Sequence, residues 1–443
     1  MAEFVPESMT YCSVHVGAQK QHQLITRSLN EYCATTLLSL QITNLPLMPS
    51  SAYRPIYLDC QATTPVDQRV VAAMLPYFTQ YPGNPGSKSH LYGWEAEAAV
   101  KQARSILAEA IHATPEEIIF TSGATEANNL AIKGVAEAYL NRGRHLITVQ
   151  TEHNAVLEPC RYLQALGFEV SFLPVRPDGL IDLAEVEQAF RPDTILVSVM
   201  AANNEIGVLQ PLADIGALCR SRQVLFHTDA AQAIAKIPLD VEAMKIDLMS
   251  FTAHKIYGPK GIGGLYVRRR QPRVQLAPQL HGGGQERGLR SGTLATPQIV
   301  GLARAVELAL VEQESESQRL IQLRQQLWQQ LNSLEGVHLN GHPTQRLPGC
   351  LNISVEGVEG QALLLGLQPV VAVSSGSACT SAKTTPSHVL TALGRDPQLA
   401  YASIRFGIGR FNTAAEIDQV AQQVIATVKS LRQNTFAPAF YQE

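Results

Sequence analysis

From residue 56 onward, short apolar runs alternate with amphipathic segments, and this alternation restricts the chain to few folds. The apolar runs, each bounded by Gly, Pro or polar residues, cover residues 118–120, 145–149, 194–200, 224–226 and 248–251. The segments with helical spacing include residues 95–110, 126–140 and 154–166. Strands that alternate with helices form βαβ units, because parallel neighbours need a crossover connection. The pattern therefore predicts an α/β fold with a mostly parallel main sheet between helices.

A long helix is predicted over residues 298–333, where leucines recur at helical spacing. Shorter strands at 337–340, 350–355 and 404–408 follow, and then an amphipathic helix at 414–431. A chain of 443 residues exceeds one average domain. We therefore predict a large domain over residues 53–310, with an N-terminal arm, and a smaller α+β C-terminal domain over 311–443.

Residues 1–52 differ from the rest of the chain. They are rich in Ser, Thr, Gln and Asn and show little periodicity. Their basic residues are Lys20 and Arg27, set against three glutamates, whereas a transit peptide is rich in Arg and poor in acids. We predict a disordered extension or, alternatively, a true start at Met48.

Charge and cysteine content exclude several classes of protein. The net charge of -3 gives no basic footprint for direct nucleic-acid binding. Seven scattered cysteines without a Cys-X-X-Cys pair argue against a disulfide framework or a structural metal site, and they favour a reducing compartment. No apolar run approaches the roughly 20 residues that span a bilayer. We therefore predict a cytoplasmic protein without a membrane segment or a metal site.

The first chemical motif lies at residues 120–129, which read Phe-Thr-Ser-Gly-Ala-Thr-Glu-Ala-Asn-Asn. A strand ends, a turn of small residues follows, and a helix begins near Ala124 and Thr125. Free N–H groups and the positive end of the helix dipole favour a phosphate at such a junction. The alternative is that Ser122 or Thr125 only caps the helix.

Asp229 and Lys255 each follow an apolar strand, so both are expected at the carboxyl edge of the sheet, where open α/β folds bind ligands. A carboxylate there can pair with a protonated ring nitrogen, although a helix cap or salt bridge is the alternative. A lysine held out of water can form a Schiff base with an aldehyde cofactor. Thr252 and His254 beside it could reach a phosphate. The alternative is a solvated turn, which fits Lys260 better than Lys255.

Cys379 and Arg405 are candidates in the C-terminal part. Cys379 lies in a run of small polar residues, whereas structural cysteines prefer a core, so its thiol could move to a substrate. It could equally be incidental. Arg405 alternates with apolar residues on a short strand and suits a bidentate carboxylate contact, with an internal ion pair as the alternative.

Two further stretches support a cofactor site. His153 follows a strand end and could stack on a ring or move a proton. The glycine-rich residues 281–284 lead to Thr293, in a segment that could approach a phosphate closely.

Taken in this order, the motifs resemble cysteine desulfurases of the NifS/IscS type, within the class V aminotransferase-like branch of fold-type I pyridoxal 5'-phosphate (PLP) enzymes. The resemblance runs from about Ile56 to Leu431. Its most specific strings are Ser-Gly-Ala-Thr-Glu at 122–126, Asn-Asn-Glu-Ile-Gly at 203–207, His-Lys-Ile-Tyr-Gly-Pro-Lys-Gly at 254–261 and Ser-Gly-Ser-Ala-Cys-Thr-Ser at 375–381. It implies a large PLP-binding domain with a seven-stranded type of sheet.

The resemblance also implies a role for each matching residue. Lys255 would carry PLP and move protons, Asp229 would pair with the ring nitrogen, and Gln232 would contact the phenolic oxygen. His153 would stack on the ring and take part in catalysis. The full implied cofactor set is Ala124, Thr125, His153, Asn204, Asp229, Gln232, Thr252, His254 and Lys255, with Thr293 contributed by the second subunit of a homodimer.

The implied reaction takes sulfur from L-cysteine. Arg405 and Asn204 would bind the substrate carboxylate. The Cys379 thiolate would attack the substrate sulfur, which leaves alanine and a persulfide. The sulfur would pass to an acceptor protein, such as an iron–sulfur scaffold or a thiolation carrier, and Cys379 could contact an iron–sulfur cluster transiently.

Some positions depart from the family pattern. Cys60 stands where an aromatic residue is usual, and we interpret it as a packing residue. The sequence after residue 435 lacks the longer tail with which housekeeping members dock the scaffold, which puts that partnership in doubt. Two other hypotheses stay open: a related PLP enzyme such as a selenocysteine lyase, and a non-catalytic family member that acts as a binding partner.

Overall fold

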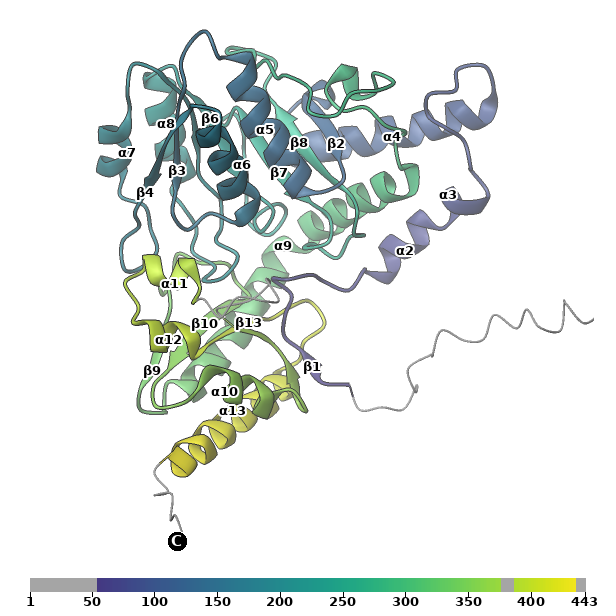
Figure 1. The fold of residues 1–443 in the computed structure, drawn as a ribbon. Helices are drawn as coiled ribbons and strands as arrows, with labels where there is room; N and C mark the ends of the chain where they lie inside the picture. The colour runs from purple at the N-terminus through teal and green to yellow at the C-terminus, as the bar shows by residue number, and fades with distance from the viewer. Residues whose placement is uncertain (1–53, 376–385, 436–443) are drawn as a thin grey trace, which may run out of the picture. The chain divides into compact units, whose positions relative to one another are not determined.

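The computed structural model describes residues 54–375 and 386–435 (Figure 1). The chain divides into two units, Met1–Arg54 and Pro55–Glu443, and the description below concerns the second. The predicted N-terminal extension, residues 1–52, lies outside the described residues, and so does Cys379. No helix within the described ranges is long and apolar enough to cross a membrane.

The main sheet has seven strands in the order β2-β8-β7-β6-β5-β3-β4. β3 to β7 pair in parallel, while β8 is antiparallel to both β7 and β2. The prediction of a mostly parallel sheet is confirmed. The strand bounds are β2 (Ile118–Thr121), β3 (His145–Val149), β4 (Glu169–Leu173), β5 (Thr194–Ser198), β6 (Leu225–Asp229), β7 (Leu248–Thr252) and β8 (Gly263–Val267).

Helices cover both faces of this sheet, because its strands are apolar on both sides. On β2, Ile119 packs in one cluster with α5 (Ala124–Ala138) and α6 (Asn154–Ala165). Its neighbours Ile118 and Phe120 point the other way, into the cluster that includes α4 (Leu91–Glu109), α8 (Leu212–Ser221) and the first half of α9 (Thr296–Leu331).

Two strands of the main sheet were not predicted. β4 is an edge strand whose first residue, Glu169, is exposed, so it lacks the apolar run that marks the inner strands. β8 begins with Gly263 and Gly264, which the sequence places in a glycine-rich loop. A Cβ at Gly263 would lie 2.4 Å from the Phe251 carbonyl oxygen, and one at Gly264 would lie 2.4 Å from the Phe251 ring. Close packing on β7 therefore requires glycine in this strand.

A second, antiparallel sheet has the order β12-β13-β10-β9. Its strands are β9 (Val337–Leu339), β10 (Cys350–Val355), β12 (Ser374–Ser375) and β13 (Ser403–Gly407). The second half of α9 packs on its core together with α10 (Gly360–Leu367) and α13 (Ala414–Thr435). Figure 1 shows α9 running from the main sheet to this lower sheet. The domain division at residue 310 stays a prediction.

An extended N-terminal segment, residues 55–67, joins the two regions. β1 (Ile56–Tyr57) pairs with β11 (Val371–Ala372), and the Cys60 N–H donates to the Gly407 carbonyl. Farther along, the Thr64 N–H donates to the His254 carbonyl, 2.8 Å away. This segment therefore brings residues 60–64 beside Lys255. The remaining helices are α2 (Gln68–Met74), α3 (Pro76–Thr79), α7 (Leu183–Ala189), α11 (His388–Ala392) and α12 (Pro397–Tyr401), with short 3-10 helices at Pro115–Glu117 and Glu286–Gly288.

Candidate active site

A cavity of about 540 Å³ lies where strands of the main sheet end. We call it the strand-end cavity. It forms there because the carboxyl ends of parallel strands share one edge, and the turns that follow them converge. Nine of the predicted cofactor residues line it: Ala124, Thr125, His153, Asn204, Asp229, Gln232, Thr252, His254 and Lys255.

One end of the cavity has the features of an anion site. α5 begins at Ala124, and its N-cap is Gly123 with φ 153°, a backbone angle that favours glycine. No side chain caps this helix, so neither Ser122 nor Thr125 does so, contrary to the alternative interpretation. The first N–H groups of α5 are therefore left for another partner.

Positive charge also gathers in this cavity. Lys255 and Lys260 line the cavity with His254. Burial, followed by the charges of Lys255, Lys260 and Lys236, lowers the pKa of His254 to about 4. The ring is therefore neutral at pH 7, and its Nδ1 lies 3.2 Å from Thr63 Oγ1. Lysines, hydroxyl groups and a free helix N-terminus together suit a phosphate.

Asp229 ends β6, and two donors hold its carboxylate in the cavity wall. Asn128 Nδ2 donates to Oδ2 over 2.7 Å, and the Ala231 N–H donates to Oδ1 over 2.8 Å. The residue is 6% exposed, so its orientation is fixed by protein groups. A carboxylate with this burial can pair with a protonated ring nitrogen of a ligand.

His153 forms the N-cap of α6, where its Nδ1 accepts the Ala155 N–H over 3.0 Å. An accepting Nδ1 leaves the proton of a neutral ring on Nε2. The residue is exposed and lines the cavity. Partial desolvation, and next the charge of Lys255, lower the pKa of His153, which favours the neutral ring.

Arg405 lies on β13 beside the strand-end cavity but does not line it. Its Nη1 donates to the Asn204 carbonyl over 3.0 Å, so the two predicted substrate residues are neighbours. Its Nη2 lies 2.8 Å from Asp59 Oδ1 and 3.0 Å from Ser374 Oγ. The internal ion pair that was the alternative interpretation is therefore present, and it exists together with the contact to Asn204.

Besides Arg405, one predicted residue of the described chain does not line the cavity. Thr293 is exposed and does not line it. Cys379 lies outside the described residues. In the other direction, Asn128 was missed although it holds Asp229. It falls one helical turn after Ala124 within the first motif, so helical spacing could have identified it.

The comparisons with known proteins agree with this geometry. Residues 56–420 match the family Aminotransferase class-V. A cysteine desulfurase of Mus musculus is 58% identical over 381 residues, which cover 86% of this chain and 83% of that protein. A cysteine desulfurase of Homo sapiens gives the same identity and coverage. The chain belongs to the cysteine desulfurases of the class V aminotransferase family. Membership of this family implies a PLP-dependent enzyme.

Solved structures related to this cysteine desulfurase have the same fold. The whole length of a NifS-like protein aligns with 85% of this chain, at a TM-score of 0.79 and 39% identity. A structure of SspA in complex with cysteine covers 81% of this chain with its whole length, at a TM-score of 0.73 and 40% identity. The resemblance stated from the sequence motifs is confirmed.

The cytoplasmic prediction is contradicted by other relatives of this cysteine desulfurase. Proteins of Arthroderma benhamiae and Drosophila melanogaster, 58% and 57% identical, are named mitochondrial cysteine desulfurases. The prediction rested on scattered cysteines, and the four in the described ranges are indeed buried and free. Free cysteines indicate a reducing environment, but they do not distinguish one reducing compartment from another.

Proposed function

We propose that the strand-end cavity binds PLP at Lys255, and that the enzyme converts L-cysteine to L-alanine while Cys379 takes up the sulfur as a persulfide. The persulfide then passes its sulfur to an acceptor protein in iron–sulfur cluster, thio-cofactor or tRNA biosynthesis. The observation that carries the proposal is that a lysine, a fixed carboxylate and a free helix N-terminus line one cavity.

The residues of this cavity fit PLP in three places. The N-terminus of α5, with Thr125, Thr252 and His254, suits the phosphate. Asp229, held by two donors, suits the ring nitrogen. Asn204 Oδ1 is buried and without a partner among the described residues, so it can accept from a bound ligand. When bound, PLP withdraws electrons from the substrate and so stabilises a carbanion.

The chain's own groups then orient the substrate and move protons. Lys255 Nζ takes and returns protons beside the substrate carbon. The neutral His153 ring offers Nε2–H in the cavity, where it can stack or donate. Arg405, held beside Asn204 and Asp59, binds the carboxylate of L-cysteine by its guanidinium. SspA was solved with cysteine bound, which supports this substrate.

Sulfur transfer requires a nucleophile from this chain. The thiolate of Cys379 attacks the sulfur of L-cysteine; the new S–S bond forms as the substrate's C–S bond breaks, and the carbon takes up a proton. L-alanine leaves, and Cys379 carries one extra sulfur atom. A reductant or an acceptor thiol then removes that sulfur. We further propose that the enzyme acts as a homodimer in which the partner's Thr293 completes the phosphate site.

The proposal is tested by comparing the wild type with Cys379→Ala. The wild type, supplied with L-cysteine and a reductant, is expected to release sulfide and alanine in equal amounts. Cys379→Ala should keep the yellow absorbance of bound PLP and lose sulfide release. Cys219→Ala, a cysteine buried on α8, is the matched control and should retain activity. Full sulfide release by Cys379→Ala would contradict the assignment of the nucleophile.

A further inference from the structure

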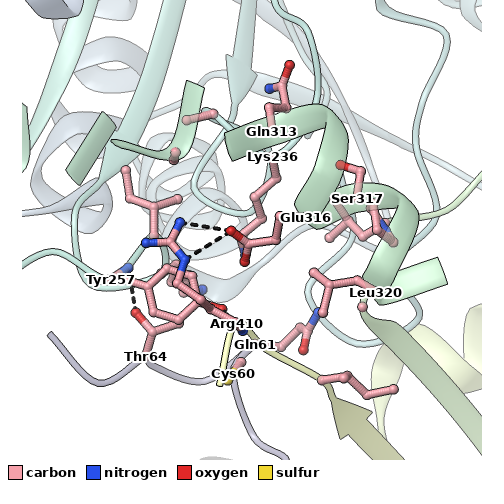
Figure 2. A pocket seen from close by; sticks show the side chains of 18 residues that line it. Cys60, Gln61, Thr64, Lys236, Tyr257, Gln313, Glu316, Ser317, Leu320 and Arg410 are labelled. Carbon is pink, nitrogen blue, oxygen red and sulfur yellow. Dashed lines mark hydrogen bonds and ion pairs between the residues drawn. The ribbon is translucent and has the colours of Figure 1, made fainter. Parts of the chain in front are cut away.

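A second, smaller cavity shares Lys255 with the strand-end cavity (Figure 2). We call it the α9 cavity, because side chains of that helix, including Glu316, line it. Cys60, Lys236 and Arg410 reach it from distant parts of the sequence. It encloses about 50 Å³, far below the roughly 300 Å³ of a typical ligand pocket, so it does not suit a substrate.

Three cations line this cavity, and two of them, Arg410 and Lys236, have different partners. Arg410 lies 2.8 Å from Glu316, 2.9 Å from Asp67 and 3.3 Å from Glu312, so carboxylates balance its charge, and Figure 2 shows the contact with Glu316. Lys236 forms no ion pair with any residue of the described ranges. Its Nζ donates instead to Gln232 Oε1 over 3.2 Å. A partly buried lysine without a carboxylate costs free energy, so fold stability does not account for it.

The contacts of Gln232 determine which way its amide points. Lys236 can only donate, so it must face Oε1. The Gln61 carbonyl can only accept, and it receives the Gln232 Nε2–H over 2.8 Å. The Lys236 donor and the Gln61 acceptor therefore both require the same orientation of the Gln232 amide, and the Gln232 side chain is 3% exposed. The second N–H of Nε2 remains for the strand-end cavity, which Gln232 lines.

We infer that Lys236 is a positioning residue, whose ammonium group holds the Gln232 amide so that one N–H stays available to the strand-end cavity. The inference rests on the proposed function, because the acceptor of that N–H is the phenolic oxygen of bound PLP. Lys236 stands four residues after Gln232, so the hydrogen bond spans one turn of the chain.

The surroundings of Lys236 compensate its charge only in part. Besides burial, the charge of Lys255 lowers the pKa of Lys236, whereas Cys60, Cys350 and Glu316 raise it. Burial lowers the pKa of Lys236 to about 8, and the like charge of Lys255 contributes next. Burial also raises the pKa of Cys60 to about 12, so that thiol is neutral at pH 7 and supplies no counter-charge. Tyr257 and Arg410 line the same cavity, and Arg410 is already paired.

The experiment is a pH titration of the yellow absorbance of the reconstituted full-length enzyme, for the wild type and Lys236→Met. Loss of the Lys236 ammonium group frees the Gln232 amide to turn. The phenolic oxygen of PLP then loses an N–H donor and binds the titrating proton more tightly. The midpoint should rise by about one pH unit, the size expected for one lost hydrogen bond. Lys245→Met removes an exposed lysine and should not move the midpoint.

The Gln232→Ala variant separates the positioning role of Lys236 from a direct effect of its charge on PLP. In Gln232→Ala, Lys236→Met should produce no more than a small further shift, because its route to PLP is already gone. Lys236→Gln keeps an N–H donor and should shift less than Lys236→Met, which also gives a variant to use if the methionine variant fails to fold.

The outcomes are distinct. An unchanged midpoint in Lys236→Met, or an equal shift with and without Gln232, would overturn the inference and leave the proposed function intact. A wild-type protein that binds PLP without any yellow band would overturn the proposed function itself.

Discussion

The strand-end cavity and the α9 cavity share Lys255, yet they are built in opposite ways. In the strand-end cavity, polar groups are presented to the interior, and its helix N-terminus has no side-chain cap and Asn204 Oδ1 no partner among the described residues. In the α9 cavity, Arg410 pairs with Glu316, and also with Asp67 beside the cavity. The difference indicates that the first cavity is arranged for a ligand and the second mainly for stability, with Lys236 as the exception.

Among these three substitutions, the largest effect on activity should come from Asp229→Asn in the strand-end cavity. Its amide cannot hold a proton on a ring nitrogen as a carboxylate does, so sulfide release should fall about a hundredfold or more, about 2.7 kcal/mol in the barrier. The melting temperature should change little. Steady-state rates and a thermal melt of the same sample check this, and a normal rate would remove the functional contrast between the cavities.

In the α9 cavity, Arg410→Met should lower the free energy of unfolding but leave the binding of PLP intact. It leaves Glu316 without its partner, whereas Asp67 keeps its ion pair with Arg69, and removing one member of a buried pair costs about 3–5 kcal/mol. Urea unfolding should show this loss while PLP still binds. Arg161→Met, which breaks an exposed pair with Glu158, is the control and should cost less than about 0.5 kcal/mol. Loss of PLP without loss of stability would contradict the comparison.

A smaller effect is expected at Glu152, which is fully buried next to His153. Its Oε1 accepts the Met200 N–H, and burial raises the pKa of Glu152 well above its usual range. The folded state therefore binds a proton more tightly than the unfolded state. Stability should fall as pH rises above about 4.5, the ordinary range of an unfolded glutamate.

The Glu152→Gln variant removes this titration. Between about pH 5 and pH 8 the wild type should lose more stability than the variant, and the two curves should run parallel below pH 4. Urea unfolding across that range measures the difference. Parallel curves at every pH would show that Glu152 is not held in its protonated form.

The sequence predicted the strand-end cavity well for a physical reason. Asp229 and Lys255 follow apolar strands, and parallel strands bring their ends to one edge whatever the details of packing. The α9 cavity had no such signal. Cys60 was interpreted as a packing residue, and Lys236 was not identified, because the residues that line the cavity come from separate segments between Cys60 and Arg410. Only folding brings those segments together.

The same distinction holds for the fold. Apolar runs and helical periodicity predicted strands β2, β3, β5, β6 and β7 and the long helix α9. β4 was missed because an edge strand tolerates exposure, and β8 because its glycines serve close packing against Phe251. The compartment was predicted wrongly, since buried free cysteines carry no information about which organelle holds the protein.

The most direct test of the account compares the wild type with Lys255→Ala, both reconstituted with PLP. The wild type should be yellow and should release equal amounts of sulfide and alanine from L-cysteine in the presence of a reductant. Lys255→Ala should lose turnover and the absorbance of the lysine-bound cofactor, while its fold is retained. Turnover by Lys255→Ala, or a yellow wild type that releases neither product, would contradict the central claim that this cavity performs the desulfurase reaction.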